Sequence, residues 1–301
     1  MNIQHRFLLI FLPLLMIACQ QGDSSSEESL SSAAEATEEV RIISLSGFLT
    51  EVLHEMGHGD QIVGRDVTST YPESVAQNAP SLGHVSQLNL EALLQLKPNY
   101  LFYESDQKQQ FAALEQLEKA GVKLIEVPTS FFFNNSLQAA KAISEHLPDK
   151  TNQLQQMANR IKADSTALAE KVGQIASEEA PKVLFIYARG AGRLMVSGTG
   201  TAAAAIIEKS GGQNAISSFE NYRALTPEAL VEASPDVILM FTSGLASLDG
   251  REGLGQITGI PQTEAYKNNR IKAMDGHYLT AFGPRVVSAA TELADFLYQA
   301  E

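Results

Sequence analysis

The chain has 301 residues, which is enough for one large domain or two of ordinary size. Hydrophobic residues make up 44% and charged residues 19%, a globular composition that argues against wholesale disorder. The 22 basic and 35 acidic residues give a net charge of −13, which argues against nucleic-acid binding because phosphate neutralisation needs clustered Lys and Arg. A single cysteine excludes an intrachain disulfide and a cysteine-based zinc or iron–sulfur site.

The first apolar stretch, Phe7–Ala18, predicts a secretory signal. Its twelve residues are too few for an ordinary membrane span, which needs about 20. It follows a short polar start and ends at a small residue, which is the layout of a signal peptide. Because the only cysteine, Cys19, comes next, residues 1–18 resemble a bacterial lipoprotein signal. That resemblance implies that Cys19 is lipidated; a plain signal followed by a buried cysteine is the alternative.

Residues 19–39 are predicted to form a flexible acidic tether. After Cys19 they hold six acidic residues, no basic ones and one large aliphatic residue, Leu30. Such a segment cannot bury enough apolar surface to offset its loss of conformational entropy. The folded part is therefore expected to begin near Val40. Export also argues against cytoplasmic chemistry that depends on ATP or NAD.

One helix–strand unit occurs twice, at a constant offset of 137 residues: LNLEALLQLKPNYLFY from Leu88 and LTPEALVEASPDVILMF from Leu225. In each copy an N-cap, Asn89 or Thr226, opens a short helix that ends before a proline and leads into a buried strand. The matched pairs are Leu88 and Leu225, Glu91 and Glu228, Ala92 and Ala229, Leu93 and Leu230, and Pro98 and Pro235.

Apolar, β-branched runs alternate with helical stretches along the rest of the chain. This alternation predicts an α/β fold with parallel sheets, and the repeated unit predicts two similar lobes, residues 40–148 and 181–301. The runs that predict strands are VRIISLS, QIVGRD, YLFYES, VKLIEV, KVLFIYA, RLMVS, VILMFT and RIKAMD.

Residues 149–180 are predicted to hold one long helix that connects the lobes. Apolar residues from Leu154 to Ile175 recur at spacings of three, four and seven, which places them on one helical face. About 25 residues at about 1.5 Å each give a rod of roughly 38 Å, long enough to run along both lobes. A long surface helix of a single domain is the alternative.

Four segments together give the chain a family resemblance: GRDVTSTYPES from Gly64, MVSGTGTAAAAIIEKSGGQNA from Met195, YRALTPEALVEASPDVIL from Tyr222 and RIKAMDGHYLTAFGPR from Arg270. Over nearly all of residues 40–301 the chain resembles the substrate-binding proteins of ATP-binding-cassette (ABC) importers that serve siderophores, cobalamin and haem. Within that class the haem binders are most similar. The resemblance implies two Rossmann-like α/β lobes joined by one long helix.

Tyr71 is the main candidate for ligand binding, because the tyrosine of this motif ligates ferric iron in the haem-binding family. A phenolate is a hard, anionic donor suited to Fe(III), and tyrosine is an established axial haem ligand. Its ordinary pKa is near 10, so a neighbouring cation must favour the ionised form. Pro72 places Tyr71 on a loop. A half-buried tyrosine that packs the rim between the lobes is the alternative.

Two arginines are candidates for that cation, Arg223 first and Arg285 second. Each lies on a loop near the ends of strands and keeps its charge, so it can bond the phenolate or a haem propionate. A surface arginine is the alternative for each. The second iron ligand cannot be identified from the sequence, although the predicted loops carry His84 and His277. Structural roles are expected for His54, His58 and His146.

The segment Gly198, Thr199 and Gly200 follows a predicted strand and opens an alanine-rich helix. It fits the dinucleotide fingerprint only formally, because no acidic residue ends a strand about 20 residues later. Such a helix start can still attract an anion such as a propionate, and close packing of small residues is the alternative. A second aromatic candidate is the run Phe131–Phe133, which suits either a flat apolar cleft or the end of a strand.

Glu91 and Glu228 form the symmetric acidic pair of the repeat. In the importer class, one acidic residue per lobe contacts arginines of the membrane permease, so the resemblance implies permease docking for both. Both residues also sit in the first turn of a predicted helix, where the helix dipole stabilises a carboxylate without any partner.

The sequence thus predicts a binding protein and not an enzyme. It is expected to be lipid-anchored on the periplasmic or cell-surface face of a bacterial membrane, to capture haem between its lobes and to deliver it to an ABC permease with its ATPase. Haem is then transported cargo rather than a catalytic cofactor. Two alternatives remain: a ferric-siderophore or corrinoid binder of the same class, whose ligand needs no bond to Tyr71, and an exported α/β hydrolytic enzyme.

Overall fold

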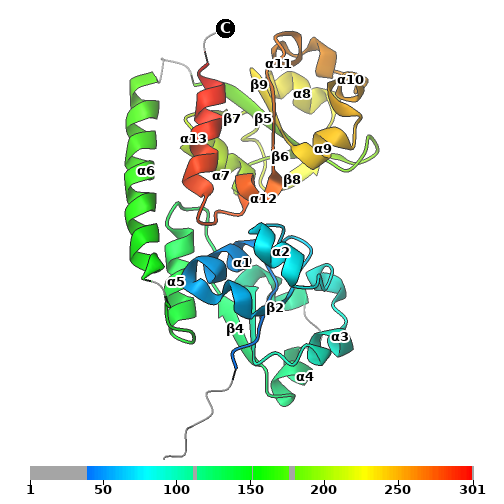
Figure 1. Ribbon diagram of the computed structural model, residues 1–301. Helices are drawn as coiled ribbons and strands as arrows, with labels where there is room; N and C mark the ends of the chain where they lie inside the picture. Colours follow the sequence, from blue (N-terminus) through cyan, green and yellow to red (C-terminus); the bar gives the residue numbers. More distant parts are fainter. Residues whose placement is uncertain (1–38, 111–113, 151, 176–179, 300–301) are drawn as a thin grey trace, which may run out of the picture. The chain divides into compact units, whose positions relative to one another are not determined.

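The structure, a computed structural model, describes residues 39–110, 114–150, 152–175 and 180–299. It contains two β-sheets, and one long helix lies between them in the sequence (Figure 1). The predicted signal, Cys19 and the tether up to residue 38 lie outside these residues. Residues 39–301 form one compact unit, so the two lobes can be described together.

The N-terminal lobe is built on an all-parallel, four-stranded sheet in the order β2-β1-β3-β4. Its strands are β1 (Ile42–Ser44), β2 (Ile62–Arg65), β3 (Tyr100–Glu104) and β4 (Lys123–Val127). Its helices are α1 (Gly47–Leu53), α2 (Glu73–Asn78), α3 (Leu90–Gln95), α4 (Leu114–Lys119) and α5 (Asn135–Ser144), with a π-helical turn at His54–His58 and 3₁₀ turns at Gly59–Gln61, Val85–Gln87 and Ser105–Gln110.

The C-terminal lobe is built on a mixed sheet in the order β10-β9-β5-β6-β8, with β7 also paired to β5. Its strands are β5 (Lys182–Ala188), β6 (Leu194–Ser197), β7 (Gln213–Asn214), β8 (Tyr222–Ala224), β9 (Val237–Phe241) and β10 (Ile271–Met274). Its helices are α7 (Ala202–Lys209), α8 (Pro227–Ala233), α9 (Thr242–Ala246), α10 (Gly250–Leu254), α11 (Glu264–Lys267), α12 (Gly276–Thr280) and α13 (Val286–Leu297), with a 3₁₀ turn at Ile260–Gln262.

Two strands of this second sheet depart from the parallel arrangement that the sequence predicts. Strand β6 runs antiparallel to β5, and β8 runs antiparallel to β6. The chain reverses directly after β5, where the Arg193 amide donates to the Gly190 carbonyl at 3.2 Å and Gly190 adopts φ 73°. A connection this short makes a hairpin, because a parallel crossover needs a dozen residues or more.

The fold confirms the repeated helix–strand unit. The Asn89 side chain accepts a hydrogen bond from the amide of Ala92, and Thr226 accepts one from Ala229, each at 3.1 Å. A residue with positive φ follows each helix, Lys97 (48°) in one copy and Ser234 (37°) in the other. The same side-chain caps and the same left-handed ending therefore place a strand behind each helix.

Each sheet is covered on both faces, because alternate residues of its central strands point to opposite sides. In the N-terminal lobe, Ile42 and Phe102 join the core beneath α1 and α5, whereas Ile43 and Leu101 join the core beneath α3. The C-terminal lobe repeats this arrangement on β5 and β9. The carboxyl ends of the strands are thereby fixed in space, and open α/β sheets bind ligands at these ends.

The long helix α6 (Gln153–Ile175) contributes one face to both cores. Leu154 packs against the N-terminal core, whereas Met157, Ile161 and Leu168 are buried in the C-terminal core. Its 23 residues make a rod of about 35 Å that runs beside α5 and α13 (Figure 1). One connecting helix is therefore present as predicted, while the lobe boundaries placed at residues 148 and 180 stay predictions.

Among the described residues, no helix is both long enough and apolar enough to span a bilayer.

Met157 provides a test of this shared helix. Its side chain is fully buried, so Met157→Ala is expected to lower the free energy of unfolding by about 2–5 kcal/mol through lost contacts and a cavity. The neighbouring exposed side chain of Gln156 is the control, and Gln156→Ala is expected to change the free energy by less than about 0.5 kcal/mol. Denaturant unfolding measures both, and equal effects would contradict the packing described here.

Candidate ligand-binding site

The loop that carries Tyr71 is built around the buried carboxylate of Asp66, which follows β2. One Asp66 oxygen accepts from the amide and hydroxyl of Thr68, at 3.0 and 2.6 Å. The other oxygen accepts from the amide and hydroxyl of Ser69, at 3.1 and 2.6 Å. Charge-assisted hydrogen bonds of this kind are the strong ones, so the four together hold the loop in one conformation immediately before Tyr71.

The same loop is tied to α1. The Ser69 hydroxyl lies 2.8 Å from that of Thr50, and the amide of Gly47 donates to the Thr68 hydroxyl at 3.0 Å. Tyr71 itself is 44% exposed, and Pro72 forms the N-cap of α2 behind it. A fixed loop thus presents an accessible phenol, which is the placement that a tyrosine ligand needs.

The structure brings Arg285, and not Arg223, onto Tyr71. Arg285 lies immediately before α13, and its guanidinium carbon is 3.7 Å from the centroid of the Tyr71 ring and 5.1 Å from that of Tyr278. Arg223 lies instead on the edge strand β8, exposed, with its guanidinium 4.5 Å from the Phe219 ring. Arg223 was the first candidate for this cation in the sequence analysis, because the sequence does not show which of the two arginines faces the other lobe.

Glu51, on α1, holds Arg285 in this position. Both Glu51 carboxylate oxygens accept from Arg285 Nε, at 3.1 and 3.2 Å, and a terminal nitrogen of Arg285 donates to the same carboxylate. His277 on α12 donates from Nε2 to Glu51 at 2.9 Å. Gly47 makes room for this approach, since a Cβ there would lie 2.5 Å from the His277 ring. The carboxylate therefore joins the two lobes.

The electrostatics of this cluster favour charged partners. Burial acts to raise the pKa of Glu51, but the hydrogen bonds and charges of His277 and Arg285 outweigh it and hold the pKa below its usual value. Burial acts to lower the pKa of Arg285, and the bonds to Glu51 together with the Tyr71 phenol raise it. A buried carboxylate thus stays ionised and keeps a cation beside the Tyr71 ring.

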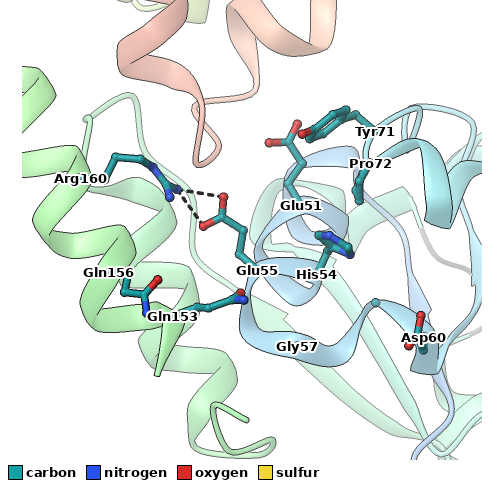
Figure 2. Close-up of a pocket in the computed structure, with 11 residues that line it drawn as sticks. Glu51, His54, Glu55, Gly57, Asp60, Tyr71, Pro72, Gln153, Gln156 and Arg160 are labelled. Atoms are coloured by element: carbon teal, nitrogen blue, oxygen red, sulfur yellow. Dashed lines mark hydrogen bonds and ion pairs between the residues drawn. The ribbon is translucent and has the colours of Figure 1, made fainter. Parts of the chain in front are cut away.

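Two hollows flank the cluster. The first, of about 500 Å³, is lined by the N-terminal lobe and α6. Figure 2 shows Tyr71 and Glu51 together at one edge of it, while Glu55 points the other way to Arg160 of α6, with contacts of 2.8 and 2.9 Å. Glu51 and Glu55 in its lining are each paired with an arginine, Arg285 and Arg160, and Asp60 adds a third carboxylate.

The second hollow, of about 560 Å³, is lined by both lobes. Ser46, Glu104 and Thr129 line it from the carboxyl ends of β1, β3 and β4, and His277 and Thr280 line it from α12. This is the location at which open α/β sheets bind ligands. Because His277 lines the second hollow and its partner Glu51 lines the first, the charged cluster lies where the two hollows approach each other.

A family model described as periplasmic binding protein matches residues 42–278 of this chain. The chain belongs to the periplasmic binding protein family. Members of this family bind solutes and are not enzymes, so the alternative of an exported hydrolase is set aside. The two-lobe fold with its connecting helix is the fold of this family's solved members.

Individual relatives cover most of the chain. The periplasmic heme-binding protein RhuT from Roseiflexus sp. RS-1 is 30% identical, with a TM-score of 0.79, over 86% of this chain and 98% of that one. An uncharacterized ABC transporter substrate-binding lipoprotein, YvrC of Bacillus subtilis, is 26% identical over 86% of this chain and 80% of its own length. A cobalamin-binding protein of Halobacterium salinarum is 23% identical over 92% and 74%.

The glycine segment at the start of α7 is engaged in packing. The Gly198 amide donates to the Asn221 carbonyl at 2.8 Å, and the Thr199 amide donates to the Phe219 carbonyl at 2.9 Å. A Cβ on Gly198 would lie 2.2 Å from that same Phe219 oxygen. Gly200 adopts a positive φ of 72°, which glycine accommodates because it has no Cβ. Because two of the amides expected to bind an anion already have partners, the structure favours the packing alternative here.

Glu91 and Glu228 both have exposed side chains in the first turns of α3 and α8, as predicted. Val231, one turn after Glu228, is 82% exposed. The surface around Glu228 therefore offers an acid and an apolar side chain to a partner.

The histidines expected to be structural include a His-Glu-x-x-His sequence at residues 54–58, the spacing with which zinc peptidases hold their metal on consecutive helical turns. The helix is interrupted inside this segment by Gly57, at φ 82°. His54 is exposed, whereas His58 is buried and both of its ring nitrogens have partners, Gln61 at 2.7 Å and the Pro148 carbonyl at 3.0 Å. The two rings therefore do not share a metal, and a structural role for His58 fits.

The other predicted side chains are divided between the site and its surroundings. His84 bonds Ser86 within its own turn, at 2.8 Å. Phe131 lines the second hollow and lies 5.4 Å from the Phe282 ring of the other lobe, whereas Phe132 is 62% exposed under the Lys209 ammonium. Sequence reasoning missed Glu51 and Asp66, although each is a lone acid beside an apolar run, and a buried acid needs partners.

Glu104 gives the second hollow a measurable pH dependence. Burial raises its pKa to about 7; Asp106 and Asp66 add to this, and the hydrogen bond from Ser46 opposes it. Because the folded-state pKa exceeds that of the unfolded chain, stability is greatest below about pH 4.5 as far as this group is concerned, and is lost as the pH rises through 7.

Glu104→Gln is therefore expected to stabilise the protein by about 1–3 kcal/mol at pH 8 and to have little effect near pH 4. Denaturant unfolding of the wild type and the variant across this range measures the difference. A difference that does not vary with pH would contradict the assignment.

Proposed function

We propose that this protein is the substrate-binding component of an ABC importer and that it captures haem between its lobes, with Tyr71 as the iron ligand. The observation that carries the proposal is Tyr71 itself, an accessible phenol on a fixed loop with the Arg285 guanidinium from the opposite lobe 3.7 Å from its ring centroid. Similarity to solved heme-binding proteins supports the ligand class: RhuT at 30% identity, and two further structures at 29% and 27% with TM-scores of 0.79 and 0.75.

The chemistry of the site suits ferric haem. The phenol oxygen of Tyr71 supplies a hard donor to Fe(III), and the Arg285 guanidinium contacts the ring that carries this oxygen. A porphyrin also needs apolar contacts, and the exposed large apolar side chains include Val67 and Tyr71 of one loop and Phe131 at the second hollow. Affinity then comes from apolar burial together with the bond to iron.

A corrinoid is the second candidate ligand, because the relative from Halobacterium is named as a cobalamin-binding protein. A ferric siderophore belongs to the same class of cargo. Neither ligand offers a vacant axial position that requires Tyr71. Removal of the phenol oxygen therefore separates haem from both.

The exposed carboxylates of Glu91 and Glu228 are proposed to contact arginines of the permease, one from each lobe, when the cargo is delivered. The protein is further proposed to be held at the outer face of a bacterial membrane by a lipid on Cys19. The similarity to YvrC, which is named as a lipoprotein of an ABC transporter, supports both the transport role and the anchor.

Tyr71→Phe tests the ligand, with Tyr100→Phe as a matched control. Tyr100 loses an equivalent hydroxyl, one that accepts from Lys123 at 3.3 Å where β3 begins. Tyr71→Phe is expected to weaken hemin binding by about tenfold or more and to remove the tyrosinate-to-iron charge-transfer absorption, because the iron loses its oxygen donor. The control is expected to match the wild type.

Absorbance titrations with hemin and with cyanocobalamin measure these effects. Equal hemin curves for the wild type and Tyr71→Phe would overturn Tyr71 as the ligand. Tight cobalamin binding that is unaffected by Tyr71→Phe, without hemin binding, would establish the corrinoid alternative.

Glu91→Gln combined with Glu228→Gln tests permease docking. The double variant is expected to bind hemin like the wild type, because neither side chain lines either hollow. It is expected to lose at least about half of its stimulation of ATP hydrolysis by the reconstituted transporter, since an exposed charge pair contributes to recognition. Undiminished stimulation would leave the carboxylates with only their role at the helix N-termini.

A further inference from the structure

Glu51 is a strongly buried carboxylate whose partners lie in the opposite lobe, and the proposed function does not require it. Only 4% of its side chain is accessible, and the partners of its carboxylate are His277 and Arg285, 226 and 234 residues further along the chain. An ion pair this buried seldom adds net stability, because desolvation of both charges offsets their attraction. A role in the site therefore deserves consideration beside a role in holding the lobes together.

The geometry links Glu51 to Tyr71 through a single side chain. Arg285 has many rotamers when free, and 30% of its side chain is still accessible here. Two parallel contacts from its fork to the carboxylate of Glu51 fix the guanidinium in one plane. With that plane fixed, the guanidinium lies against the Tyr71 ring.

We propose that Glu51 is a positioning residue for the Tyr71 ligand, acting through Arg285; this inference rests on the proposed haem-binding function. The carboxylate keeps the guanidinium of the C-terminal lobe against the phenol ring of the N-terminal lobe. It also engages Nε and one terminal nitrogen of Arg285, which leaves fewer donors for a carboxylate of the cargo.

The arrangement of charges around Tyr71 supports this assignment. The guanidinium carbon of Arg285 lies 3.7 Å from the centroid of the Tyr71 ring, where the attraction between the positive charge and the ring face orients the phenol. Without Glu51, the partly buried cation would lose its compensating charge and turn toward water. The phenol would then lose both the neighbouring charge and the contact that orients its ring.

Glu51→Gln tests the proposal, with Glu292→Gln as the control. Glu292 lies on α13 and pairs with Lys272 at 2.8 Å, and neither residue lines either hollow. Glu51→Gln is expected to weaken hemin binding about tenfold and to reduce the tyrosinate-to-iron absorption. Glu292→Gln is expected to leave hemin affinity within about twofold, as an exposed pair contributes little.

The deciding measurement repeats Glu51→Gln in the Tyr71→Phe background. If Glu51 acts through the phenol, its substitution costs nothing further once the phenol oxygen is gone, so the two losses are not additive. An equal loss in both backgrounds would overturn the proposal and leave Glu51 as a tie between the lobes, and no loss in either would also overturn it. Wild-type binding by Tyr71→Phe alone would instead refute the proposed function.

Arg285→Lys provides a second route to the same answer, and it decides the question should Glu51→Gln fail to fold. Lysine keeps the charge but loses the planar two-point contact with Glu51. It is expected to weaken hemin binding in the wild-type background and to have no further effect in the Tyr71→Phe background. Additive losses here would overturn the proposal in the same way.

Discussion

The candidate site depends on the contacts that the buried carboxylate of Glu51 makes with the opposite lobe. It comes from a helix whose seven residues are all buried, so the charge cannot turn to water and must find its partners inside the protein. Those partners, His277 and Arg285, belong to the other lobe. The energetic requirement of one buried charge therefore dictates which loops of the two lobes meet.

A second buried carboxylate, Asp66, holds the Tyr71 loop in place, as Glu51 holds the two lobes together. It collects four hydrogen bonds within three residues, and through Ser69 and Thr68 it ties the loop to α1, the same helix that carries Glu51. Tyr71 is thus held from its own lobe by one acid and faced from the other lobe by an arginine that a second acid holds. Pre-organisation of this kind places the ligand atom before the cargo arrives.

Much of the architecture was predictable because short stretches of sequence determine the individual helices and strands. The apolar runs, the side-chain caps at Asn89 and Thr226 and the apolar face of α6 each specify an element without reference to distant residues. Strand β8 was not predictable, since its three residues are all exposed and carry no alternation. The direction of β6 was missed because the preceding turn, at Gly190, was not recognised as a hairpin.

The site was only partly predictable for the same reason. Tyr71 stood out through a local motif, and its exposure in the structure fits that prediction. The choice between Arg223 and Arg285 depended on how two lobes face each other, and a linear pattern does not encode that relation. Glu51 gave one faint signal, a single acid within FLTEVL, whose meaning emerges only once its partners more than 200 residues away are in place.

The apolar face of α6 packs against both cores, and the change from one to the other takes place within one helical turn. Leu154 packs against the N-terminal core and Met157 against the C-terminal core. The helix is accordingly a structural part of each half rather than a linker laid between two finished domains. Cleavage of the chain near the N-terminal end of α6 would remove packing contacts from one core. It would also expose apolar side chains of the helix to solvent. Each half therefore needs α6 to complete its core, and the two halves share this helix as one structural element.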